Sequence, residues 1–315
     1  MIEITNASMV FAKKGLGKVE EGSGFKALDN ISITIPDGCI YGFLGSNGAG
    51  KSTLLRMMCG VYRTEQGSVK IDGEDAFDNP VAKSKIFFVN DETVQFTKFT
   101  LDGLAKFYAS YYDSFSFEIY NRLVAQLQLP KNKRMSEFSK GMKRQAVVII
   151  GLSCNTKYLL LDEAFDGLDP AMRKFIKQII VNELIDRQAT MVVSSHNIVE
   201  INELCDRAML IHQGQMIFAD EIDNIKSGFG KVQLARRSGA VTPEELKNGG
   251  LEVMQYSVMG SVAQAVVRGT EAEITEKINK FNCEISEFIP LTLEEIFIYE
   301  LEARGYGASI INPAV

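Results

Sequence analysis

Hydrophobic and polar positions alternate in two short stretches near the start of the chain, residues 1–5 and 31–35. This period of two is typical of half-buried β-strands. Between them, residues 13–24 are rich in Gly, Lys and Glu, and we predict a hairpin loop or an insertion there. Residues 40–44 are an apolar strand that leads into a glycine-rich turn, and the helix predicted after this turn spans residues 51–59.

Two continuous apolar runs, residues 158–161 and 190–194, are typical of central parallel strands that are covered on both faces. Between these runs, apolar residues recur at the spacing of an amphipathic helix. They are Met172, Phe175, Ile176, Ile179, Ile180 and Leu184. Asp169 is the predicted N-cap of this helix and Pro170 lies in its first turn. The succession of strand, helix and strand predicts an α/β domain.

Residues from about 100 to 155 are predicted to be helical and contain many aromatic side chains. These aromatics fit two interpretations: packing inside a small helical subdomain, or a surface that receives a partner helix. After about residue 220 the pattern changes to short alternating runs, followed by capping boxes that begin at Thr270 and Thr292. The runs are residues 232–235, 251–256 and 262–267. We therefore predict a small α+β accessory domain.

Composition narrows the class of protein. Apolar residues make up 46% and charged residues 23% of the 315 residues, which is typical of a soluble globular protein. The 34 Lys and Arg residues against 40 Asp and Glu residues give a net charge of −6, so no nucleic-acid partner is expected. The five cysteines form no CxxC pair or Cys/His cluster, so neither disulfides nor structural zinc is expected. We find no signal peptide and no apolar run long enough to cross a membrane.

Residues 45–52 match the phosphate-binding pattern G-x-x-x-x-G-K-[ST], between a predicted strand and a predicted helix. Glycines let the backbone N–H groups point at phosphates, and the helix N-terminus adds positive potential. Lys51 is expected to reach the β- and γ-phosphates, and the Ser52 hydroxyl to bind Mg²⁺. The predicted nucleotide-binding residues are Gly45, Ser46, Asn47, Gly48, Ala49, Gly50, Lys51, Ser52 and Thr53.

Two acids, Asp162 and Glu163, end the apolar strand at residues 158–161. As an isolated pair they fit surface acids, but beside a phosphate loop they fit ATP hydrolysis. Asp162 would then hold Mg²⁺ through water, and Glu163 would polarise the attacking water. His196 follows the second apolar strand, a placement that puts it at the ligand crevice of a parallel sheet, near the γ-phosphate. The alternative for His196 is an ordinary polar residue at a helix start.

In this order, the motifs resemble the nucleotide-binding subunit of an ATP-binding cassette (ABC) transporter, from residue 1 to about residue 220. Residues 138–145, Phe-Ser-Lys-Gly-Met-Lys-Arg-Gln, occupy the place of the family signature. Residues 166–169 resemble the loop that follows the catalytic Glu. The resemblance implies an α/β fold, namely a P-loop ABC ATPase core with an antiparallel β subdomain and a helical subdomain.

The implied ABC ATPase domain spans residues 1–222, with its helical subdomain at about 91–155, and the accessory α+β domain spans residues 228–315. The resemblance also implies that Phe11 stacks on adenine, with Phe25 as the alternative because of the insertion between them.

The signature segment would bind the γ-phosphate across the interface of two subunits, through Ser139, Lys140 and Gly141. It departs from the usual Leu-Ser-Gly-Gly-Gln at Phe138, Lys140 and Met142. Lys140 either adds positive charge near ATP or faces solvent.

The family glutamine that joins Mg²⁺ to the helical subdomain falls at Asp91, or at Asn90 with a shift of one residue. A carboxylate at this position would bind Mg²⁺ more strongly than an amide because it is charged. The alternative for Asp91 is a loop turn away from the metal.

The implied mechanism needs ATP, Mg²⁺ and two partners. Two such subunits, as a homodimer or a heterodimer, would close head to tail around two ATP molecules. Their motion would drive a separate integral membrane permease, which would hold the subunits at the cytoplasmic inner face of the cell membrane. The departures in the signature segment and at Asp91, together with the late segment at residues 291–297, make the chain resemble the branch that pairs with exporter-type (ABC-2) permeases.

Two other classes of function share some of these motifs. A soluble ABC-type ATPase would act as a nucleotide-gated regulatory or binding module without transport. A small-molecule kinase would share the phosphate loop, but it would not need the signature segment or Glu163 beside Asp162.

Overall fold

A computed structural model of the chain describes residues 1–11, 24–90 and 96–304. The chain divides into two compact units, Met1–Ala219 and Asp220–Val315. Asp91, and the predicted loop up to residue 23, lie outside the described residues.

A six-stranded sheet forms the centre of the first unit. Its strands, in spatial order, are β10 (Gln215–Glu221), β9 (Arg207–His212), β3 (Ile40–Leu44), β8 (Thr190–Ser195), β7 (Tyr158–Asp162) and β6 (Ile86–Val89). The pairs from β9 through β6 are parallel. Every residue of β7 and β8 is buried. The two continuous apolar runs were therefore correctly predicted to be central parallel strands.

A second, antiparallel sheet lies in the same unit. Its order is β2 (Phe25–Ile35), β1 (Ile2–Phe11), β4 (Gln66–Ile71) and β5 (Glu74–Asp75). Strands β1 and β2 are longer than the stretches with strict alternation. Their register shifts between Ile4 and Ala7 and again before Met9, and such bulges interrupt the period of two.

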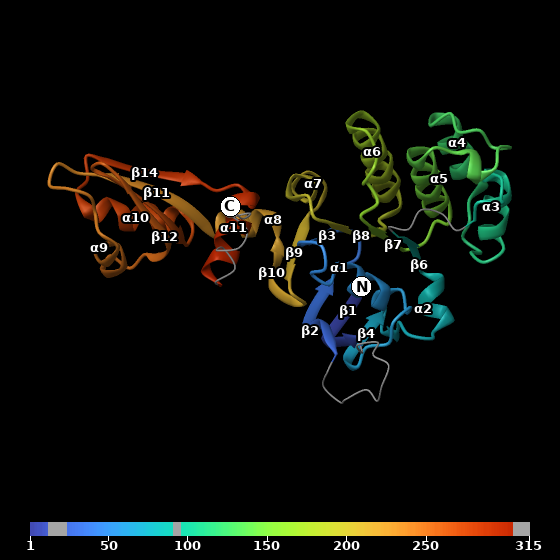
Figure 1. Ribbon diagram of the computed structural model, residues 1–315, viewed down its shortest axis with the longest axis horizontal. Helices are drawn as coiled ribbons and strands as arrows, with labels where there is room; N and C mark the ends of the chain where they lie inside the picture. Colours follow the sequence, from blue (N-terminus) through green and yellow to red (C-terminus); the bar gives the residue numbers. More distant parts are fainter. Residues whose placement is uncertain (12–23, 91–95, 305–315) are drawn as a thin grey trace. The chain divides into compact units, whose positions relative to one another are not determined.

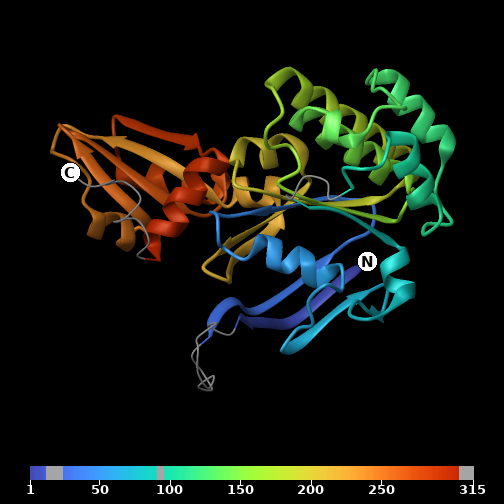
Figure 2. The same ribbon diagram turned by 45° about the vertical axis from the view of Figure 1, so that its right-hand side comes forward.

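Helices cover the parallel sheet on both faces. They are α1 (Lys51–Met58), α2 (Pro80–Ser84), α3 (Leu101–Ala109), α4 (Phe117–Gln126), α5 (Lys140–Ser153), α6 (Pro170–Arg187) and α7 (Ile198–Leu204), with a short 3-10 helix at Met135–Glu137. Figures 1 and 2 show α3 to α6 on one side of this sheet and α1 with the antiparallel sheet on the other. Helix α1 ends one residue earlier than predicted. Asp169 caps α6 by accepting from the Met172 N–H at 3.0 Å, as predicted.

The aromatic side chains of α3 pack against one another. The Phe107 ring lies 5.0 to 5.5 Å, between centroids, from those of Phe96, Phe99, Tyr108 and Tyr111. This confirms the packing interpretation for most of the cluster. Tyr111 and Phe117 remain 69% and 45% exposed, so a partner surface stays a prediction for these two side chains.

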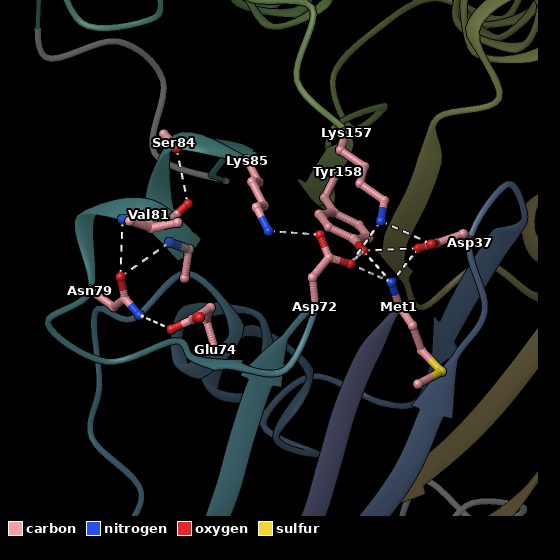
Figure 3. A network of polar contacts seen from close by, with 11 residues as sticks. Met1, Asp37, Asp72, Glu74, Asn79, Val81, Ser84, Lys85, Lys157 and Tyr158 are labelled. Carbon is pink, nitrogen blue, oxygen red and sulfur yellow. Dashed lines mark hydrogen bonds and ion pairs between the residues drawn. The ribbon is translucent and has the colours of Figure 1, made fainter.

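A polar network joins the two sheets at the start of β7, at the opposite end of this strand from Asp162 (Figure 3). The Tyr158 hydroxyl lies within hydrogen-bond distance of two carboxylates, 2.6 Å from Asp72 Oδ1 and 2.8 Å from Asp37 Oδ1. Lys157 and Lys85 contact Asp72 at 2.7 and 2.9 Å. Partial burial by itself would raise the pKa of Asp72, but these hydrogen bonds outweigh it and hold the pKa below its usual value.

The second unit contains an antiparallel sheet. Its order is β12 (Glu252–Met259), β13 (Val262–Arg268), β11 (Phe229–Ala235) and β14 (Ile285–Pro290). Its helices are α8 (Ile222–Ser227), α9 (Pro243–Asn248), α10 (Glu271–Ile278) and α11 (Leu293–Ala303), with a 3-10 helix at Asn279–Phe281. Both predicted capping boxes are present, at Thr270 and Thr292, and a third occurs at Thr242. Residues of α9, α10 and the sheet share one hydrophobic core.

Candidate active site

The loop between β3 and α1 requires glycine at two positions. A Cβ atom at Gly45 would lie 2.3 Å from the Ile211 carbonyl oxygen. Gly50 has a φ of 113°, and its Cβ would lie 2.7 Å from the Ala27 oxygen. A larger residue at either position would push the loop away from its neighbours, so these glycines fix the path of the loop into the first turn of α1.

Lys51, the first residue of α1, is 4% exposed. Its Nζ donates to the carbonyl oxygens of Gly45 at 2.7 Å and Ser46 at 3.1 Å, and lies 3.5 Å from Glu163 Oε1. Burial lowers the pKa of Lys51, while Glu163, Asp162 and Asp166 oppose this effect. The loop and the end of β7 therefore surround one buried cation.

Asp162 ends β7 and is fully buried. Its Oδ1 accepts from the Ser52 hydroxyl at 2.9 Å and from the Ser194 hydroxyl at 2.5 Å. Its buried Oδ2 has no hydrogen-bond partner within residues 1–11, 24–90 and 96–304. A buried carboxylate oxygen without a donor, beside a serine hydroxyl, fits a hard cation such as Mg²⁺.

Glu163 and His196 face each other across the carboxyl ends of β7 and β8. Glu163 Oε2 lies 3.5 Å from His196 Nδ1, and these side chains are 22% and 47% exposed. The backbone N–H of Glu163 contacts both the carbonyl oxygen and the hydroxyl of Ser194, each at 3.2 Å. Strand pairing thus places the predicted base and the predicted histidine side by side.

A pocket of about 350 Å³ opens beside this cluster. Its lining residues are Phe11, Phe25, Ala27, Asn47, Gly48, Ala49, Gly50, Lys51, Ser52, Thr53 and Glu163. Both candidate adenine-stacking residues line it, because Phe11 and Phe25 pair across β1 and β2. The Phe11 ring packs edge-on against Tyr62, with centroids 5.5 Å apart, whereas Phe25 is 59% exposed.

Two contributors to the site were missed from the sequence. Asp166 comes within 4.8 Å of Glu163 and His196, measured between side-chain atoms that could bind a metal. Ser194 binds Asp162 because the two residues are paired in parallel register. That register depends on tertiary packing. Asp166, in contrast, lies in the loop at residues 166–169 that resembles the one after the catalytic Glu, and its carboxylate is a signal visible in the sequence.

The signature segment lies apart from this pocket. Ser139 caps α5 by accepting from the Met142 N–H at 3.2 Å. Ser139 and Lys140 are exposed, Phe138 is 4% exposed, and Gly141 is half-buried. In the part of the chain that the structure describes, the lining of the pocket includes none of Ser139, Lys140 and Gly141. The Lys140 side chain instead runs beside Gly167, within about 3.3 Å of where a Cβ would stand.

The metal-binding role predicted for Asp91 falls outside the described residues. Its alternative, Asn90, directly follows β6. The Asn90 carbonyl oxygen accepts from Arg144 Nη1 at 2.8 Å, and Arg144 is a buried residue of α5. The end of β6 is therefore joined to α5, the helix that begins at the signature segment.

In the described part of the chain, no helix has the length and hydropathy needed to cross a membrane. A family model described as ABC transporter matches residues 28–166. The ABC transporter ATP-binding protein NatA of Bacillus subtilis is 31% identical over 235 residues, which cover 71% of this chain and 91% of that protein. YtrB, an ABC transporter ATP-binding protein of the same organism, is 25% identical over 87% of this chain and 93% of its own length.

A further relative is the bacitracin transport ATP-binding protein BcrA of Bacillus licheniformis, 31% identical over 64% of this chain and 67% of that protein. Among solved structures, the ATP-binding subunit of an ABC transporter superposes with a TM-score of 0.62 at 21% identity, over 72% of this chain and 92% of the other. The dimeric bacterial cassette MJ0796 gives a TM-score of 0.61 at 20% identity, over 70% of this chain and 98% of the other. These two likenesses support the fold.

Proposed function

Because this chain belongs to the ATP-binding subunits of ABC transporters, we propose that it hydrolyses ATP and thereby powers export through a separate membrane permease. One observation carries the proposal. Glu163, which lines the pocket, lies 3.5 Å from both Lys51 Nζ and His196 Nδ1. Asp162 accepts a hydrogen bond from Ser52, another residue of the pocket lining. Phosphate binding, metal binding and activation of water therefore meet at one place.

The proposed roles follow from the chemistry of each group. Loop N–H groups and Lys51 hold the phosphates, since both present positive potential. Ser52 and Asp162 would hold Mg²⁺, which neutralises phosphate charge when bound. Glu163 orients the attacking water and accepts its proton, and His196 contacts the γ-phosphate. Asp91 is proposed as a further metal contact from the helical side.

Hydrolysis in this proposal needs a second subunit. Ser139, Lys140 and Gly141 lie outside the pocket of their own chain, at the N-terminus of a 14-residue helix. Helix N-termini attract phosphate, so these residues are suited to the γ-phosphate held by a partner. We propose head-to-tail closure around two ATP molecules, as a homodimer or heterodimer.

Coupling to the permease is proposed at the helical subdomain. Tyr111 and Phe117 are large exposed apolar side chains there, and such groups are suited to contacts with another protein. The permease would hold the subunit at the inner face of the cell membrane. The similarity to BcrA, a bacitracin transport ATP-binding protein, supports transport rather than the alternative of a nucleotide-gated module without a permease.

Glu163→Gln tests the proposed chemistry. The variant keeps the size of the side chain but loses the base, so we expect ATP turnover to fall by about 100-fold or more while ATP binding persists. With Mg-ATP, light scattering should show a stable dimer that the unchanged chain forms only transiently. Glu294→Gln, an exposed acid in the first turn of α11, is the matched control.

Turnover of Glu163→Gln at the rate of the unchanged chain would remove Glu163 as the base. Transport can be measured in vesicles that contain the co-purified permease. If the protein forms ATP-dependent dimers but Glu163→Gln leaves transport by these vesicles unchanged, the regulatory module would be favoured instead.

A further inference from the structure

Close to the chain segment that carries His196 lies a mostly buried ion pair that the proposed mechanism does not use. Lys177 of α6 and Glu200 of α7 bring Nζ and Oε1 to 3.3 Å, and their side chains are 13% and 5% exposed. The loss of hydration of two buried charges offsets much of their attraction, so such a pair is weak evidence for stability. Its neighbours indicate another role.

Glu200 is joined to the residues on both sides of His196. Its Oε2 accepts from the Ser195 hydroxyl at 2.7 Å, and Ser195, 2% exposed, directly precedes the histidine. The same hydroxyl accepts from the backbone N–H of Asn197 at 3.0 Å. The Asn197 side chain in turn accepts from the N–H of Glu200 at 3.2 Å. The backbone that carries His196 is therefore tied to this one carboxylate.

Lys177 contacts the other half of the site. Its Nζ lies 5.7 Å from the centroid of the Phe165 ring, a cation–π contact. Phe165 is 1% exposed and stands two residues after Glu163. Helices α6 and α7 follow β7 and β8 in the chain (Figure 1). The ion pair thus connects the turn that carries Glu163 with the turn that carries His196.

The His196 side chain itself has a weak hold on its position. It is 47% exposed, and its 3.5 Å approach to Glu163 is longer than a strong hydrogen bond. Its placement therefore depends on its backbone. We propose that Lys177 and Glu200 are positioning residues, which hold His196 against Glu163 for the catalytic step without touching ATP. This inference rests on the proposed function for the role of His196.

Two histidines in the chain, His196 and His212, make a direct test possible. In the full-length chain with ¹³C-labelled histidine, the two ring resonances are assigned with His196→Ala. Glu200→Gln keeps the shape of the side chain but leaves Lys177 without its closest counter-charge. We expect this change to shift or broaden the His196 resonance and to leave the His212 resonance in place. An unmoved His196 resonance overturns the inference.

The matched control is Glu203→Gln. Glu203 also contacts Lys177, at 3.5 Å, but it is 62% exposed. We expect it to leave the His196 resonance unchanged. A shift equal to that of Glu200→Gln would mean that any change of charge near Lys177 acts on the site, and would overturn the specific role of Glu200.

Kinetics separate positioning from general stability. Glu200→Gln should lower kcat by about tenfold, with KM for ATP within about twofold, because a small misplacement slows the chemical step more than it weakens binding. In a His196→Ala background the same change should have little further effect. Equal losses in both backgrounds would show that Glu200 does not act through His196, and would overturn the inference.

Ser195→Ala provides a second route if Glu200→Gln does not fold. It removes the hydroxyl between Glu200 and His196 and leaves the ion pair intact, while Ser195→Thr retains a hydroxyl. We expect Ala to shift the His196 resonance and Thr to restore it; no shift with Ala would overturn the inference. The response of the same resonance to Mg-ATP tests the proposed function separately, because it does not depend on Glu200.

Discussion

Glu163 shows how much a single residue of this site depends on its surroundings. Its φ of 45° is left-handed, a conformation that costs a residue with a side chain about 1 kcal/mol or more. The two contacts of its N–H with Ser194 hold this conformation and turn the carboxylate toward Lys51. Lys51 is itself buried and lies 3.5 Å from the Glu163 carboxylate. The charged groups of the site are therefore held in place before a nucleotide binds.

The adenine platform is a prediction at the same scale. We expect Phe25→Ala and Phe11→Ala each to weaken ATP binding, since both rings line the pocket. Phe25 is 59% exposed and lacks the Tyr62 contact of Phe11, so its loss should leave folding intact and act on nucleotide alone. Loss of a stacking ring is worth about 1 kcal/mol, or roughly fivefold in Kd.

Isothermal titration with ATP and with pyrophosphate checks this prediction. Either variant should bind pyrophosphate like the unchanged chain, because that ligand has no base. If a variant binds ATP with unchanged affinity, the ring that it lacks does not stack on adenine.

Asp72 gives a pH prediction. Its folded pKa is lowered, so its stabilisation is present above the unfolded value near 3.8 and disappears as the pH falls below that value toward the folded pKa. Asp72→Asn should lower the free energy of unfolding at pH 7 by about 2 kcal/mol. The difference from the unchanged chain should shrink near pH 3. Urea titrations of intrinsic tyrosine fluorescence at both pH values measure it.

Asp75→Asn is the control for that experiment, since Asp75 is exposed and lies three residues away in β5. A pH-independent difference for Asp72→Asn would mean that its charge does not supply the stabilisation.

At the scale of elements, the ends of helices and strands build the site. Strands β3, β7 and β8 are parallel, so the loop after β3, the two acids at the end of β7 and His196 after β8 lie at one edge. Helix α5 supplies a separate N-terminus at Ser139, and its buried face joins Asn90 through Arg144. One rigid helix therefore carries the signature segment and contacts the end of β6.

Ser139→Asp separates capping by this residue from phosphate binding. Aspartate caps a helix about as well as serine, so we expect the melting temperature to stay within about 2 °C. The added negative charge would repel a γ-phosphate across the dimer interface, and ATP turnover should fall by at least about tenfold. Thermal melts and phosphate release measure the two effects.

Asp169, the N-cap of α6, offers the reverse control. Asp169→Ser should keep both the cap and the turnover. Full ATP turnover by Ser139→Asp would mean that Ser139 does not contact the γ-phosphate held by the partner subunit.

At the scale of the whole molecule, the arrangement of two chains becomes testable by mixing. Lys51→Ala disables the phosphate loop but leaves a good signature segment, and Ser139→Asp does the opposite. In a head-to-tail dimer of the two variants, one site combines the intact loop with the intact segment. We expect the mixture to regain ATP turnover that each variant lacks alone, up to about a quarter of the unchanged rate, since half of the dimers are mixed.

Lys51→Ala mixed with Glu163→Gln is the control. Both changes there fall on the loop side, so neither site of a mixed dimer is whole. Equal activity in the two mixtures would contradict the head-to-tail arrangement.

The sequence by itself determined the elements that depend on local pattern. Local spacing of residue types predicts the glycine-rich loop, the buried strands β7 and β8, the Asp169 cap and two capping boxes. This spacing involves residues close together in the sequence, so it does not depend on how distant parts of the chain pack. This was enough to predict an α/β core and a nucleotide-binding loop.

Only the tertiary structure decided which residues meet. The register of β7 with β8 places Ser194 on Asp162, and the tertiary fold brings Lys177 of α6 to Glu200 of α7. The tertiary structure also places both Phe25 and Phe11 at the pocket. The physical reason is that hydrophobic periodicity fixes the face of an element but not its register against a neighbour, which is set by the simultaneous packing of the whole core.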